Sequence, residues 1–171
     1  MPSPQQPSFF AQTAHHPFDG GAVTLLGAVS AVTGAMTQVE IGGKKILVDC
    51  GIAQGDEARR WRMPAAATAS DAVVLTHGHA DHIGSLPLLL DAGYGGPIFG
   101  TPSTLELAAL GMEDGLRLQG ASAEQIAAFL RRFRKLWKPA GYAASADGPA
   151  VALPDSDARF AFTKPGNTRV K

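Results

Sequence analysis

The sequence has little cysteine, no excess of either charge and no long apolar run, and each of these shortages excludes a class of protein. Its 171 residues include one cysteine, Cys50, so neither an internal disulfide nor a zinc site built from cysteine pairs is expected. Lys plus Arg number 15 and Asp plus Glu number 15, so overall charge provides no attraction to nucleic acid or to an anionic membrane. No apolar run reaches the roughly 20 residues that span a bilayer. Any bound metal must therefore be held by nitrogen and oxygen atoms.

The first 20 residues also lack a recognisable pattern. A basic segment followed by an apolar core, which marks a secretory signal, is missing there, so we expect a cytoplasmic protein without a membrane partner. Several prolines and the neighbours His15 and His16 occur without periodicity. Residues 1–20 are therefore predicted to be a flexible tail whose histidines bind nothing. Hydrophobic residues make up 45% of the chain, so residues 21–171 are predicted to form a single α/β domain.

Apolar patterning after the tail predicts strands first, and then helices alternating with strands. Gly42 and Gly43 between two short apolar runs predict a hairpin. The later order of strand, helix and strand is typical of a βαβ unit. The predicted strands are 22–26, 37–41, 45–49, 72–75, 97–99 and 159–163, and the predicted helices are 82–91, 102–119 and 122–137.

Three of the five histidines fall within six residues, directly after the predicted strand 72–75. His77 and His79 are two residues apart in an extended segment, so their side chains project to the same side. Asp81 and His82 follow where the chain turns into a helix. Imidazole nitrogens and carboxylate oxygens are the ligands expected for zinc, with manganese or iron as alternatives. The window predicts a metal site, against the plainer interpretation of a polar loop with Asp81 as a helix N-cap.

Such a ligand set is suited to hydrolysis. In a two-metal site the ions lie roughly 3.5 to 4 Å apart, generate hydroxide at neutral pH and neutralise charge on the group that is attacked. This chemistry needs neither a serine nor a cysteine nucleophile. Spacing and residue type leave the substrate open.

The window resembles the His-x-His-x-Asp-His signature of the metallo-β-lactamase fold. Residues 83–87, 95–104, 26–34 and 46–51 are similar to the β-CASP branch of that fold, whose members cut RNA or DNA. The resemblance covers about residues 21–118. It implies an α/β fold of the αββα sandwich type, of which this chain supplies about the N-terminal half. It also implies a metal-dependent hydrolase, most of all one that cleaves RNA phosphodiesters.

The resemblance gives each residue of the window a role. His77 and His79 would bind the first of two zinc ions, with manganese as the alternative metal. Asp81 and His82 would bind the second ion, and Asp81 would also act in catalysis by orienting the bridging hydroxide. Asp49, at the end of its strand, would support the ligand loop through hydrogen bonds. The alternative for Asp49 is an ordinary turn residue at a strand end.

The family completes its site with later residues, and here the sequence departs from the pattern. No histidine follows His82. The stretch 160–168 resembles the one that would carry the next histidine ligand, and Asn167 stands at that position. We therefore expect an incomplete domain that binds metal weakly and lacks the full ligand set for catalysis. An uncovered sheet face would favour self-association.

Two other functions stay open at this stage. One is a non-catalytic binding or assembly module, or a truncated relic, that keeps the fold without turnover. The other is a hydrolase of a thioester or a lactam. RNA is the expected partner of the main hypothesis, and basic and aromatic residues at 129–138 could contact it, although their spacing also suits the solvated face of an amphipathic helix. Arg59, Arg60 and Arg62 could steer phosphates or belong to a merely polar loop.

Overall fold

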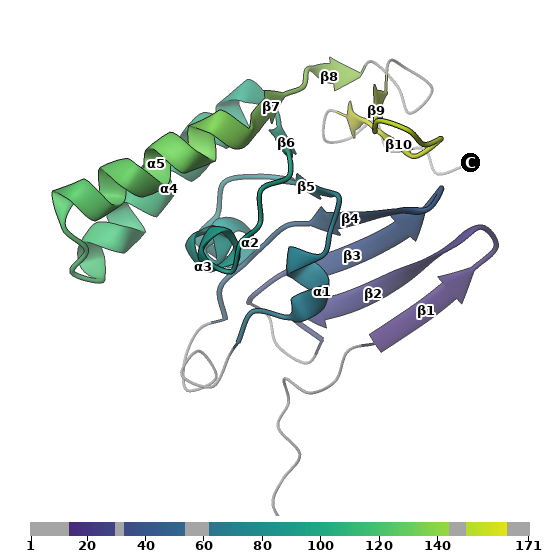
Figure 1. Ribbon diagram of the computed structural model, residues 1–171, viewed down its shortest axis with the longest axis horizontal. Coiled ribbons are helices and arrows are strands. Elements are labelled where there is room, and N and C mark those ends of the chain that lie inside the picture. Colours follow the sequence, from purple (N-terminus) through teal and green to yellow (C-terminus); the bar gives the residue numbers. More distant parts are fainter. Residues whose placement is uncertain (1–13, 30–32, 54–61, 144–149, 164–171) are drawn as a thin grey trace, which may run out of the picture.

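The computed structural model describes residues 14–29, 33–53, 62–143 and 150–163. Within these residues, seven strands form one mixed sheet whose spatial order follows the chain from β1 to β7 (Figure 1). Pairings from β1 to β4 are antiparallel, and those from β4 to β7 are parallel. The strands are β1 (Ala14–Phe18), β2 (Gly21–Gly27), β3 (Met36–Ile41), β4 (Lys44–Val48), β5 (Ala72–Val74), β6 (Ile98–Gly100) and β7 (Trp137–Pro139).

Helices connect the parallel strands, as the predicted βαβ pattern requires, and they cover one face of the sheet (Figure 1). Parallel strands need such crossover connections, and a consistent hand places the connections on the same side. The longest two helices, α4 and α5, pack against each other. The described helices are α1 (Ala65–Thr68), α2 (Ala80–Ile83), α3 (Leu86–Asp91), α4 (Pro102–Leu118) and α5 (Ala123–Leu136).

The single helix expected over 82–91 is instead two short helices, α2 and α3, and the expectation was wrong for a local reason. Ser85, between them, donates its backbone N–H to the Cys50 carbonyl at 2.9 Å and its hydroxyl to the Gly51 carbonyl at 2.7 Å. Both groups are thus committed to the loop after β4 rather than to a continuous helix. The break sets the direction of α2, which carries Asp81 and His82.

Two strands of the main sheet were missed in the sequence. Residues 14–18, expected in the flexible tail, form β1, an edge strand paired with β2 from Ala14 opposite Leu25 to Phe18 opposite Gly21. An edge strand tolerates its proline, Pro17, because one side of it makes no ladder. Residues 137–139, expected at the end of a helix, form β7 beside β6. Residues 1–13 lie outside the described part of the chain.

Side chains alternate between the two faces of the sheet. Leu47 and Val73 point into the larger core beneath the helices, whereas Ile46 and Val74 point into a smaller core on the second face. Short strands from the C-terminal region pack on that second face and supply Val151, Phe160 and Phe162. These strands are β8 (Tyr142–Ala143), β9 (Val151–Ala152), β10 (Arg159–Phe160) and β11 (Phe162–Thr163), so the strand expected at 159–163 is divided between two pairings.

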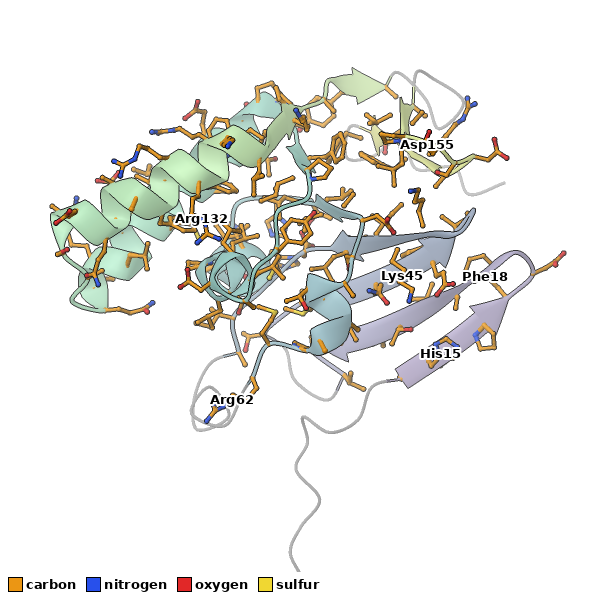
Figure 2. The ribbon with its side chains drawn as sticks, in the orientation of Figure 1. His15, Phe18, Lys45, Arg62, Arg132 and Asp155 are labelled. Atoms are coloured by element: carbon orange, nitrogen blue, oxygen red, sulfur yellow. The ribbon has the colours of Figure 1, made fainter. Side chains whose placement is uncertain are left out.

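Among the described residues, those that pack on the second face cover β4 to β6 and leave β1 to β3 open. Phe18 and Ile41 lie on the open part and are 45% and 37% exposed. Figure 2 shows Phe18 on the outermost strand of the sheet. The helix layer and the main sheet thus match the expected half of a sandwich, and the expected uncovered face is found over part of its width. In the described residues no helix has the length and apolar character needed to cross a bilayer.

Candidate metal centre

The predicted ligand residues lie close together where the chain leaves β5 and enters α2. The His77 ring centroid is 4.0 Å from that of His82 and 4.6 Å from that of His79. The Oδ2 atom of Asp81 lies 3.6 Å from Nε2 of His82. All four side chains of the window are therefore neighbours, as their spacing predicts, and their role as metal ligands stays a prediction.

Asp49 is the residue that holds this loop. Its buried carboxylate accepts a hydrogen bond from the Thr76 backbone N–H at 2.8 Å, another from the Thr76 hydroxyl at 2.7 Å and a third from Nδ1 of His82 at 2.7 Å. Its backbone adopts φ +60°, which is uncommon for a residue other than glycine and occurs often at functional sites. Asp49 thus makes the supporting hydrogen bonds that the resemblance implies.

The loop after Asp49 also binds the backbone of α2. Cys50 N–H donates to the carbonyl of His82 at 2.7 Å, and Ala35 N–H donates to the carbonyl of Asp81 at 2.9 Å. Gly51 lies so near that a Cβ atom built on it would stand 1.6 Å from the Asp81 carbonyl oxygen. This clamp was missed in the sequence, and the glycine directly after Asp49 and Cys50 is the only local signal for it.

Two pKa shifts bear on the chemistry. Partial burial, followed by the neighbouring imidazoles of His82 and His79, lowers the pKa of His77 below its usual value of 6.5. His77 is therefore neutral at pH 7, the form that binds metals. Burial, with Asp49 beside it, raises the pKa of the Cys50 thiol. Cys50 is thus an uncharged buried side chain and not a reactive thiolate.

The chemistry of the donor set fits a metal ion. Because a carboxylate only accepts hydrogen bonds, Nδ1 of His82 must carry a proton, and in the neutral ring the lone pair is then on Nε2. That lone pair faces the Asp81 carboxylate across a 3.6 Å gap too long for a hydrogen bond, an arrangement that a cation would stabilise. Among the described residues, however, no three His, Cys, Asp or Glu side chains are arranged to hold a metal. A metal site formed by the four residues of the window therefore stays a prediction.

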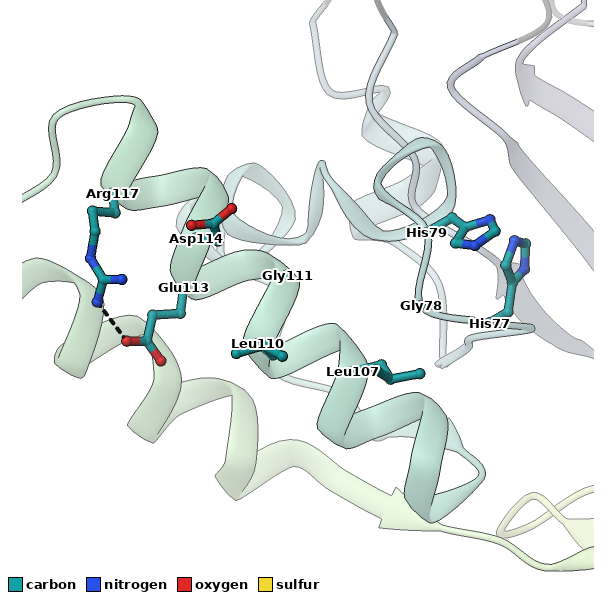
Figure 3. Close-up of a pocket in the computed structure, with 9 residues that line it drawn as sticks. All are labelled: His77, Gly78, His79, Leu107, Leu110, Gly111, Glu113, Asp114 and Arg117. Carbon is teal, nitrogen blue, oxygen red and sulfur yellow. Dashed lines mark hydrogen bonds and ion pairs between the residues drawn. The ribbon is translucent and has the colours of Figure 1, made fainter.

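A pocket of about 660 Å³ opens beside His77 and His79 and runs along α4 (Figure 3). Its α4 wall includes Leu107 and Leu110, both exposed, and farther along an ion pair of 2.7 Å joins Arg117 to Glu113. Gly78 permits the close approach of loop and helix, because a Cβ atom there would lie 2.8 Å from that of Leu107. The histidines thus open onto a space with a largely apolar wall.

Only some of the other residues predicted to bind metal or RNA lie in the described part of the chain. Asn167, Arg59 and Arg60 lie outside the described residues, and Arg62 is exposed. In α5, Phe129 and Phe133 are buried, so the interpretation of this helix as amphipathic, with a solvated basic face, is correct.

Individual side chains of that face have other partners. Arg132 (Figure 2) bonds Asp91 at 3.2 Å, and the Arg134 guanidinium lies 5.8 Å from the ring centre of Trp137. Base stacking on Phe133 is excluded because its ring is fully buried.

A family model and several known proteins match part of the chain. The model of the metallo-beta-lactamase superfamily matches residues 31–151. Ribonuclease TTHA0252 of Thermus thermophilus is 37% identical over 139 residues, which cover 76% of this chain and 32% of that protein. Integrator complex subunit 11 of Danio rerio is 37% identical over 101 residues, or 54% of this chain and 17% of that protein. The metallo-β-lactamase resemblance seen in the sequence is thus confirmed, and the first of these relatives is a ribonuclease.

Among solved structures, the metallo-beta-lactamase fold protein YhfI from Bacillus subtilis is 22% identical, with a TM-score of 0.40. The match covers 77% of this chain and 48% of that one. The chain thus spans less than a third of the length of the two curated relatives and about half of the solved structure.

Proposed function

Because the chain belongs to the metallo-β-lactamase superfamily, we propose that it carries part of the centre of a metal-dependent hydrolase that cleaves RNA phosphodiester bonds. The observation that carries the proposal is the packing of three imidazole rings and the Asp81 carboxylate on a loop held by Asp49. The superfamily is generally metal-dependent, which supports metal binding by this cluster over the interpretation as an ordinary polar loop.

In this proposal the four residues of the window share two zinc ions, with manganese as the alternative. His77 and His79 hold the first ion, and Asp81 and His82 hold the second. A bound ion would act as a Lewis acid on a phosphoryl oxygen and lower the pKa of water. The contribution of the chain is to keep His77 neutral and to aim Nε2 of His82 at the Asp81 carboxylate. Asp81, which is partly exposed, would orient the attacking water.

RNA is the proposed substrate because the matching relatives include a ribonuclease. Local charge limits where its backbone can lie. The pocket along α4 contains one cation, Arg117, and that cation is already paired with Glu113. The exposed Arg131 and Arg134 lie instead on the outer face of α5. Phosphates are therefore expected to avoid the α4 pocket.

A non-catalytic module is the second candidate, and one observation favours it. In the part of the chain that the structure describes, three donors are not assembled around one point. A protein of this kind would keep the loop and its hydrogen bonds while binding RNA or a protein partner without turnover. The two candidates differ in whether metal is retained and used.

Metal content of the 171-residue chain at equilibrium with a buffer of fixed zinc concentration tests the proposal. We expect zinc in the wild-type protein and its loss in the double variant His77→Ala, His79→Ala. The matched control is His15→Ala, His16→Ala, which removes two exposed histidines from β1 and should leave the zinc in place.

Cleavage of an end-labelled RNA oligonucleotide, with and without a chelator, completes the test. Metal-dependent cleavage that the His77 and His79 double variant lacks supports the hydrolase. Zinc retention without cleavage supports the non-catalytic module. Equal zinc in the wild type and the window variant would show that His77 and His79 are not ligands.

A further inference from the structure

Thr76 lies between β5 and His77 and makes an unusual set of contacts. Its backbone N–H donates to Oδ1 of Asp49 at 2.8 Å, and its hydroxyl donates to Oδ2 of the same carboxylate at 2.7 Å. The same hydroxyl oxygen lies 2.9 Å from Nδ1 of His77. Thr76 thus touches both the supporting carboxylate and one of the predicted ligands.

The directions of these bonds follow from the inventory of donors and acceptors. A hydroxyl has one hydrogen, and the Asp49 carboxylate can only accept, so the hydrogen of Thr76 points at Asp49. The contact with His77 must then run the other way, from a protonated Nδ1 to the Thr76 oxygen. In the neutral ring the lone pair is therefore on Nε2 of His77, as it is for His82.

We propose that Thr76 is a positioning residue: its hydroxyl, oriented by Asp49, fixes the tautomer of His77. Asp49 then fixes the tautomers of two imidazoles, that of His82 by direct contact and that of His77 through Thr76. The metal part of this inference rests on the proposed function, in which these rings belong to different ions. The tautomer part stands on the hydrogen bonds alone.

The surrounding geometry supports such a relay. Asp49 is buried and receives both of its Thr76 bonds in a bidentate arrangement, which limits rotation of the threonine. A β-branched side chain has few χ1 rotamers, so the hydroxyl is held toward Asp49. The ring centroids of His77 and His82 are 4.0 Å apart, so the two imidazoles that depend on Asp49 are direct neighbours. Without a partner on Nδ1, a neutral imidazole in water favours the proton on Nε2, and His77 would then have no lone pair on the nitrogen that does not face Thr76.

The first test measures tautomers in the metal-free protein by long-range ¹⁵N–¹H NMR at a pH where the histidines are neutral. Thr76→Val keeps the shape of the side chain and removes the hydroxyl, and Thr76→Ser keeps the hydroxyl. In the wild type and in Thr76→Ser, we expect His77 and His82 to carry the proton on Nδ1. In Thr76→Val, His77 should shift toward the Nε2–H form while His82 stays unchanged.

A second test measures zinc affinity by competition with a chelating dye. Residues that orient a ligand histidine typically change metal affinity about 10-fold to 100-fold when they are removed. We expect a loss of about 10-fold for Thr76→Val and a much smaller change for Thr76→Ser, since the hydroxyl is what matters.

The outcomes separate this inference from the proposed function. A wild-type His77 in the Nε2–H form, or a Thr76→Val variant whose His77 keeps the Nδ1–H form, would overturn the relay. The wild-type spectrum alone decides the first of these, even if Thr76→Val does not fold. A confirmed tautomer pattern in a protein that binds no zinc would overturn the proposed function and leave the relay in place.

Discussion

Gly51 and Asp81 approach each other so closely that a Cβ atom on Gly51 would lie 1.6 Å from the Asp81 carbonyl oxygen. The contact joins the loop after β4 to the helix that bears two of the predicted ligands. No side chain fits between the two backbones. The loop that carries the predicted ligands therefore depends on the absence of a side chain at Gly51 as well as on the hydrogen bonds of Asp49.

Gly51→Ala is expected to destabilise the protein because its methyl group meets backbone that cannot move aside. Forcing an extra carbon into a packed site costs about 3 kcal/mol when the clash is with rigid groups. Urea unfolding followed by circular dichroism measures the loss. The matched control is Gly115→Ala in α4, where the new methyl meets nothing within 4 Å among the described atoms. That control should gain about 1 kcal/mol from helix propensity, and equal losses in both variants would contradict the close contact.

Asp49→Ala is expected to lower the free energy of unfolding by about 2 kcal/mol, because it leaves the donors of Thr76 and His82 without their partner. Chemical denaturation gives the value. Asp91→Ala serves as control, since Asp91 forms an exposed ion pair with Arg132 at 3.2 Å and such pairs contribute about 0.5 kcal/mol or less. Similar effects for the two aspartates would show that the loop does not depend on Asp49.

The lowered pKa of His77 predicts a pH dependence of stability. Between the folded pKa and the usual value of 6.5, the unfolded chain binds more protons at this site than the folded protein does. His77 therefore has no effect on the free energy of unfolding well above pH 6.5. As the pH falls from 6.5 toward the folded pKa, the free energy of unfolding decreases. Thermal unfolding of the wild type and of His77→Gln between pH 5 and 8 measures the contribution. The wild type should lose more stability than the variant on acidification, and an identical profile would contradict the shift.

The open face over β1 to β3 predicts self-association at high protein concentration, through the apolar side chains that include Phe18 and Ile41. Analytical ultracentrifugation over a concentration series measures it. Phe18→Glu combined with Ile41→Glu should keep the protein monomeric across the same range. Leu118→Glu changes another exposed side chain, 82% exposed at the end of α4, and should leave association unaltered. A monomeric wild type would contradict this use of the face.

Local signals in the sequence predict much of this fold. The hairpin at Gly42 and Gly43 and the βαβ unit depend on residues that are close in sequence, and both are present. The cluster of His77, His79, Asp81 and His82 was predicted for the same reason, since spacing at the end of a buried strand brings such side chains together.

Features that depend on distant residues could not be predicted in this way. The pairing of β1 needs β2 as a template, because an edge strand with a proline shows no alternation of its own. The break between α2 and α3 arises from hydrogen bonds of Ser85 to Cys50 and Gly51, more than 30 residues earlier in the chain. The contact of the Thr76 hydroxyl with Asp49 likewise joins residues that are far apart in the sequence.

The order of the strands has a consequence for how the protein is made. Because each strand from β1 to β7 pairs with its predecessor, the sheet can grow at one edge as the chain lengthens. Every hydrogen bond described for the ligand loop joins residues between 35 and 85, ahead of α4 and α5. All of these residues are therefore synthesised before α4 and α5. The loop with its histidines is therefore positioned to assemble on the nascent chain, with the long helices closing over an arrangement that already exists.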